Sequence, residues 1–172
     1  QAPRTAAGTP DLNGIWQANN AAHWDIEPHG ASKGTVRDLG ALDAMPGGLG
    51  VVDGGEIPYR PDALAPRNEN FADRLHRDPA IKCYLPGVPR ATYMPYPFQI
   101  IQGQAHIMFV HEFANAVRTV YMQDHTAAPA PSWMGWSNGR WEGDTLVIET
   151  AGFNGMTWFD RAGNFHTDGL RV

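Results

Sequence analysis

The chain has 172 residues, enough for one domain with a real core, and carries a formal net charge of −5. This charge, without any run of Lys or Arg, argues against a nucleic-acid-binding surface. A single cysteine, Cys83, excludes an internal disulfide and a cysteine-based zinc site, and no apolar run reaches the roughly 18 residues of a membrane span. The 19 Gly and 14 Pro favour short strands and long loops over helices.

Residues 1–60 predict an extended, Pro/Gly-rich arm. The opening "QAPRTAAGTP" is typical of a mature N-terminus left by signal-peptide cleavage, so we expect a periplasmic or extracellular protein. The rest of this segment has little hydrophobic periodicity, and so long a loop is usually functional or ordered by something else. Its large apolar and aromatic side chains are therefore expected to bind a partner: Trp16, Trp24, Ile57 and Tyr59.

Residues 61–78 form the one helix candidate. Asp62 can cap its start, and the Asp78-Pro79 pair ends it. Three apolar side chains share one face at helical spacing, namely Leu64, Phe71 and Leu75. We expect one short helix between the arm and the following β domain.

Residues 79–172 predict an antiparallel β domain. "CYLPGVPRATYMPYPFQ" has many prolines and is expected to be an extended, edge-like segment. Alternating patterns then predict successive strands, with a turn at Ala114-Asn115 and a hairpin in "GRWEGDTLVIET", where Gly143 is expected at positive φ. The fold class expected is mainly β, an antiparallel meander that curls into a barrel or half-barrel within one structural domain.

Three stretches carry a resemblance: "PDLNGIW", "KCYLPGVPRATYMPYPFQI" and "SWMGWSNGRWEGDTLVIETAGFNGMTWFDRAGNFHTDGL". Together they span most of residues 10–171, and they resemble a large uncharacterised family of exported bacterial proteins. The resemblance implies export and a β fold, and family members usually continue with further strands past Val172. The fold is also lipocalin-like, by analogy only. The family implies no activity.

A possible divalent-metal site lies in "HWDIEPH", whose alternate residues would share one face of an extended chain: His23, Asp25, Glu27 and His29. Imidazole and carboxylate together suit a divalent metal. Residues two apart lie roughly 6–7 Å apart in a strand, so one ion could take two of them, or three if Pro28 bends the chain. The alternative is a polar outer face beside buried Trp24 and Ile26. No other cofactor is expected.

A possible catalytic cluster lies in "WFDRAGNFHTDG", where Asp160, His166 and Asp168 flank a Gly163-Asn164 turn. A histidine with a carboxylate neighbour can act as a general base. This stretch also matches the family, so the resemblance makes these three residues its candidates. The alternative is turn chemistry, with Asp and Asn capping amides and His166 bonded to a carbonyl, and we expect His166 to be structural or interfacial.

Three functions remain open. The first is a non-catalytic binding protein, an accessory subunit on the outer, periplasmic face of a larger membrane complex such as a respiratory or photosynthetic assembly. The second is a small-ligand carrier with a pocket inside the barrel. The third is a hydrolase-like enzyme that uses Asp160, His166 and Asp168. The familiar hydrolase, protease and nucleotide motifs are missing from the sequence, which favours the first.

Overall fold

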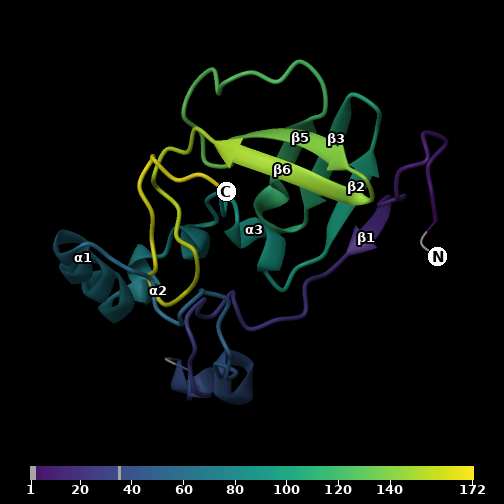
Figure 1. Ribbon diagram of the computed structural model, residues 1–172. Coiled ribbons are helices and arrows are strands. Elements are labelled where there is room, and N and C mark those ends of the chain that lie inside the picture. Colours follow the sequence, from purple (N-terminus) through teal and green to yellow (C-terminus); the bar gives the residue numbers. More distant parts are fainter. Residues whose placement is uncertain (1–2, 35) are drawn as a thin grey trace.

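The fold combines one β-sheet with several short helices (Figure 1). The computed structural model describes residues 3–34 and 36–172. In chain order the elements are β1 (Gly14–Trp16), η1 (Arg37–Asp43), α1 (Pro61–Ala72), α2 (Arg74–Arg77), η2 (Pro79–Lys82), α3 (Arg90–Tyr93), β2 (Phe98–Gln102), β3 (His106–His111), η3 (Phe113–Asn115), β4 (Val117–Tyr121), β5 (Trp136–Glu142) and β6 (Thr145–Ala151).

The six strands form one sheet in the order β1-β2-β3-β4-β5-β6. All neighbouring strands are antiparallel except β4 and β5, which are parallel. The connection between them, residues 122–135, is long enough to carry the chain back along the sheet before β5 begins. The expected antiparallel meander is therefore correct from β2 to β4 and is broken at β5.

The sheet was expected to curl into a barrel or half-barrel, and the structure shows that it is not closed into a barrel. β1 and β6 lie at its two edges and do not pair with each other. β1 contributes only three residues, and the end of β6 pairs instead with the last residue, since Thr150 and Val172 exchange two backbone hydrogen bonds of 2.8 and 3.0 Å. An open sheet has no barrel interior.

The prediction of one helix in a mainly β protein is wrong, since the fold is mixed α/β with two helices of seven or more residues, α1 and η1. Residues 61–78 do not form one helix, because Asp73 leaves the helical conformation (φ −115°) between α1 and α2. α1 begins with Pro61 at its first position and Arg60 at its N-cap, so Asp62 lies in the first turn instead of capping it. The proline-rich segment expected to be extended contains α3.

The predicted turns are confirmed. Gly143 has φ 60° in the two-residue loop between β5 and β6, at the position that a type II′ turn reserves for glycine. Ala114 and Asn115 also have positive φ, 56° and 49°. No helix in the described ranges is long and apolar enough to cross a membrane.

The core consists of two clusters of buried apolar side chains. The first lies on one face of the sheet, where strand pairing aligns its members, Ile100, Ile107, Phe109 and Val120. The second joins the segment around α3 to the residues that flank β5 and β6, and contains Val88, Ala91, Ala116, Met134 and Phe153. From there the C-terminal loop (residues 152–172, yellow in Figure 1) runs beside the α1–α2 region and back toward the sheet. This loop carries Asp160, Asn164 and His166.

Candidate functional site

Asp160 fastens the N-terminal arm to the C-terminal loop. Its carboxylate is fully buried and accepts hydrogen bonds from the backbone amides of Ile26 (2.9 Å), Ala162 (2.9 Å) and Asn164 (3.2 Å), and from Asn164 Nδ2 (2.7 Å). Burial raises the pKa of this carboxyl to about 6, against the opposite effect of the hydrogen bonds. All of these donors belong to the chain itself, so Asp160 has a structural role. We call this set of hydrogen bonds, which links the N-terminal arm to the C-terminal loop, the clasp.

Asn164 extends the clasp to α1 and to the end of the arm. Its side chain is fully buried, and Nδ2 also donates to Asp25 Oδ1 at 3.1 Å. Its Oδ1 accepts from the Tyr59 hydroxyl and from Arg67 Nε, each at 3.2 Å. Burial raises the pKa of Tyr59 to about 12. Residues 22–26 and 57–59 of the arm are thereby anchored on the chain's own C-terminal loop.

The three catalytic candidates do not form one cluster. His166 is buried, its Nε2 lies 2.6 Å from Thr157 Oγ1, and its Nδ1 lies 2.8 Å from the carbonyl oxygen of Thr167. Nδ1 therefore donates and Nε2 accepts the threonine hydroxyl proton, and burial lowers the pKa of His166. No hydrogen bond joins His166 to Asp160 or Asp168 in the described structure, and Asp168 is exposed.

The four metal candidates do not converge either. The run is not extended, since the amides of Trp24 and Asp25 both donate to the Ala21 carbonyl in a turn. Asp25 caps the Glu27 amide, His29 Nδ1 lies 2.8 Å from the Glu27 carbonyl, and the His23 ring is buried elsewhere. Within residues 3–34 and 36–172, no three His, Cys, Asp or Glu side chains are arranged to hold a metal ion.

The four residues expected to bind a partner are placed in different surroundings. Trp16 is about half exposed on β1, and its Nε1 donates to the Leu12 carbonyl at 2.9 Å. Trp24, Ile57 and Tyr59 are partly buried within the chain, with Tyr59 stacked on Phe165 at 5.7 Å between ring centres. The two most exposed apolar side chains of the arm are instead Leu42 and Leu49.

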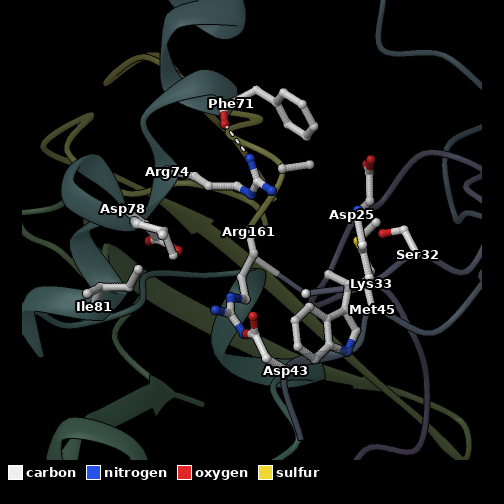
Figure 2. Close-up of a pocket in the computed structure, with 14 residues that line it drawn as sticks. Asp25, Ser32, Lys33, Asp43, Met45, Phe71, Arg74, Asp78, Ile81 and Arg161 are labelled. Carbon is white, nitrogen blue, oxygen red and sulfur yellow. Dashed lines mark hydrogen bonds between the residues drawn. The ribbon is translucent and has the colours of Figure 1, made fainter. Parts of the chain in front are cut away.

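The structure contains a cleft that the sequence analysis missed, and we call it the arginine cleft. It consists of two adjoining cavities of about 90 and about 190 Å³ that share Asp78, Ile81 and Arg161. Figure 2 shows the first cavity, with Arg161 between the arm residues Ser32 and Met45 on one side and the helical residues Phe71 and Arg74 on the other. The charged or titratable residues that line the two cavities are His23, Asp25, Lys33, Asp43, Arg74, Asp78, Arg90 and Arg161.

A buried ion pair forms part of the cleft wall. Arg90 Nη1 and Nη2 donate to the two carboxylate oxygens of Asp78 at 2.7 and 2.8 Å, and both side chains are almost completely buried. Beside them, burial and the charges of Arg90 and Arg161 lower the pKa of His23 to about 3, so its imidazole is neutral. Arg90 therefore has its charge matched by Asp78, while Arg161 brings a further positive charge.

Two other arginines of the cleft stack on aromatic rings. The guanidinium carbon of Arg161 lies 4.5 Å from the Trp24 ring, and that of Arg74 lies 4.6 Å from the Phe71 ring. Stacking holds each planar group in place. Arg74 Nη1 also donates to the Phe71 carbonyl at 2.8 Å, so the N–H edge of Arg161 is the more available of the two. Neither arginine, nor Lys33, forms a salt bridge with any residue in the described part of the chain. The cleft can thus present positive charge to a ligand.

No family model, curated protein or solved structure that was compared with the chain matches it. The resemblance to exported bacterial proteins therefore stays a prediction, and the function has to be argued from the geometry of this molecule.

Proposed function

We propose that this chain is a non-catalytic binding protein that docks on a protein partner through a projecting hairpin, residues 29–51. The proposal keeps the accessory-subunit hypothesis and moves the contact surface from Trp24, Ile57 and Tyr59 to the tip of the hairpin. The single observation that supports it best is the large apolar surface that this segment leaves uncovered.

The projecting hairpin is built from two backbone bridges. His29 and Gly48 exchange hydrogen bonds of 2.9 Å in both directions, and Ser32 and Met45 exchange bonds of 3.0 and 2.9 Å. η1 lies at its tip, and Figure 1 draws this segment (dark blue) as a lobe extending away from the sheet. The clasp at Asp160 holds its base, because Ile26 bonds both to Asp160 and, through its carbonyl, to the Val51 amide.

Four apolar side chains of this hairpin are exposed to solvent, namely Leu39, Leu42, Leu49 and Val51. Leu42 is 88% exposed and Leu49 is 97% exposed. Val51 is more than half exposed, and Leu39 is about half exposed. A single exposed leucine is ordinary, but a group of them on one projecting segment is typical of a protein-binding surface. Burying each against a partner would contribute roughly 1.5–3 kcal/mol.

The total surface supports the same proposal. A compact monomer of 18.9 kDa exposes about 8,300 Å², whereas this chain exposes 10227 Å². The difference, about 1,900 Å², is larger than the roughly 800 Å² that each partner contributes to a standard protein–protein interface. A partner that covers the hairpin through a standard interface would remove part of this excess.

The proposed setting of this docking is the outer, periplasmic face of a membrane complex, respiratory or photosynthetic for example. This part of the proposal is supported by the resemblance, and fractionation of the source cells would test it. The hydrolase alternative has less support, because no hydrogen bond joins His166 to Asp160 or Asp168 in the described structure. The alternative of a small-ligand carrier with a barrel pocket has no support in geometry, because the sheet is open.

The test is a paired substitution on the hairpin. Leu42→Glu with Leu49→Glu should leave the free energy of unfolding unchanged, since both side chains are exposed, and should release the chain from its native assembly. Ile15→Glu is the matched control, because Ile15 is 79% exposed on β1 and should have no effect on assembly. Retention of the double variant in the assembly would overturn the proposal.

Limited proteolysis gives an independent check. Cleavage between Gly30 and Gly55 should be fast in the isolated chain and suppressed in the native assembly, because the partner covers the hairpin. Equal protection of this segment in both samples would mean that no partner contacts it.

A further inference from the structure

We propose that the arginine cleft binds a small organic monocarboxylate with a flat apolar body. The base of the projecting hairpin forms part of the cleft wall through Lys33, Asp43 and Met45, whereas its exposed leucines, Leu42 and Leu49, do not line the cleft. The inference therefore does not depend on the docking function. It is carried by the charge of the cleft, the chemistry of its walls and its size.

The charge of the cleft favours an anion. Its walls carry four cationic side chains (Lys33, Arg74, Arg90 and Arg161) and three acidic ones (Asp25, Asp43 and Asp78), so one positive charge is in excess although the whole chain has a charge of −5. The three carboxylates are already engaged. Asp78 holds Arg90, while Asp43 and Asp25 accept from the Val36 and Glu27 amides at 2.7 and 2.9 Å.

Arg161 is the residue expected to hold the carboxylate. It lines both cavities, and its planar group can donate two parallel hydrogen bonds to a carboxylate. Stacking on Trp24 fixes its orientation before a ligand arrives. Burial and the charges of Arg90 and Arg161 lower the pKa of His23 and keep its imidazole neutral. The histidine therefore lines the cavity as a polar group without a charge of its own.

Polar nitrogen atoms of the larger cavity remain without partners. Arg90 Nε and His23 Nδ1 are buried, and neither has a hydrogen-bond acceptor among the described residues. A buried donor without a partner is unfavourable, and most such groups are satisfied in native proteins. A small shift of the surrounding side chains on binding an anion would give one or both of them an acceptor.

The remaining walls are apolar and close together. The larger cavity is bounded by Ile81, Met94, Tyr96 and Phe113, and the ring centres of Tyr96 and Phe113 lie 5.4 Å apart. Its volume of about 190 Å³ is below the roughly 300–1,000 Å³ of pockets for drug-sized ligands. The cleft therefore suits a carboxylate on a ring or short hydrocarbon body, and is too small for a nucleotide.

The experiment is a titration of the full chain with sodium benzoate at constant ionic strength, followed by two-dimensional NMR. We expect saturable shifts at the Trp24 indole and the Arg161 side chain, with a dissociation constant of about 1 mM or below. Benzamide has the same shape without the charge, and acetate has the charge without the ring. Both should bind roughly tenfold more weakly, as expected when one charge-assisted bond or one apolar wall is lost.

Two substitutions locate the site. Arg161→Gln should weaken benzoate binding roughly tenfold, whereas Arg60→Gln, at an exposed arginine outside the cleft, should not change it. Arg74→Gln serves as a second cleft variant if Arg161→Gln alters the spectrum of the free protein. Equal binding of benzoate and benzamide, tighter binding of inorganic phosphate than of benzoate, or equal affinity in the cleft and control variants would overturn the proposal.

Discussion

Arg90 and Asp78 form a bidentate ion pair in which both side chains are almost fully excluded from solvent. Asp78 also accepts from the Ala80 amide at 2.9 Å, at the start of η2. The pair thereby joins the end of the helical segment to α3, which lies against the second core cluster. Removal of either partner would leave a buried charge uncompensated.

Asp78→Asn should lower the free energy of unfolding by about 3–5 kcal/mol, because the Arg90 charge stays buried without its partner. The double variant Asp78→Leu with Arg90→Met should lose less than either single change, since no charge remains. Glu69→Gln, in an exposed pair with Arg77, is the control and should cost less than about 1 kcal/mol. Denaturant unfolding measures all of these, and a small effect of Asp78→Asn would show that the pair is not buried.

His23 predicts a loss of stability in acid. Its pKa is about 3 in the folded chain and about 6.5 when unfolded, so the folded state binds fewer protons. The contribution is fully present above pH 6.5 and is lost as the pH falls toward 3. Between pH 7 and pH 5 the wild type should therefore lose about 2 kcal/mol more than His23→Gln. His76→Gln, at a side chain that is 82% exposed, should behave like the wild type.

Asp160 predicts the opposite dependence on pH. Its pKa is about 6 in the folded chain and about 3.9 when unfolded, so its contribution is fully present below pH 4 and is lost as the pH rises through 6. Relative to Asp160→Asn, the wild type should lose about 2–3 kcal/mol between pH 4 and pH 7. A constant difference between the two proteins across this range would contradict the raised pKa.

Asp160→Asn should also loosen the arm. An amide oxygen cannot accept all four hydrogen bonds, so the amides of Ile26 and Ala162 should exchange with deuterium faster than in the wild type. Amides at the centre of β3 serve as the reference and should be unaffected. Unchanged exchange at Ile26 would mean that the clasp does not hold the arm.

Gly143→Val should destabilise the chain by about 1 kcal/mol or more, through backbone strain at φ 60°. No atom lies within 4 Å of a Cβ placed at Gly143, so a steric clash does not contribute. Gly30→Val is the matched control, because that glycine has equal space and lacks a positive φ. Thermal unfolding of the two variants separates strain from a general cost of replacing glycine, and equal melting temperatures would reject the strain.

The sheet was largely predictable because its signal is local. Alternation of apolar residues such as Ile107 and Phe109 specifies a strand, and Gly143 specifies its turn. The parallel pairing of β4 and β5 was not predictable, because the composition of residues 122–135 does not reveal where the chain re-enters the sheet. Whether the sheet closes into a barrel was not predictable for the same reason, because closure depends on pairing between edge strands that are distant in the chain.

The arginine cleft could not be found from the sequence, because its residues are far apart in the chain and follow no period. Arg90 lies in a proline-rich segment, and its burial makes sense only with Asp78 as its partner. Capping of nearby amides was one of the two roles expected of Asp160, and it accepts from the amides of Ala162 and Asn164. Its bond to the distant Ile26 amide was not predictable, because any residue type supplies a backbone amide. The identity of a side chain indicates which bonds it can form, but not which distant residue of the chain will be its partner.

The clasp also determines when, during synthesis of the chain, the N-terminal arm can finish folding. Asp160 and the Ile26 amide are 134 residues apart, and at about 5–20 residues per second the ribosome needs roughly 7–27 s to make the chain between them. β1 likewise cannot pair until residues Phe98–Gln102, which form β2, have been synthesised. The first sixty residues therefore leave the ribosome long before their docking surface exists, with Trp24 and Ile26 uncovered. During synthesis, the N-terminal segment thus stays open to chaperones and proteases until the chain has been made as far as Asp160.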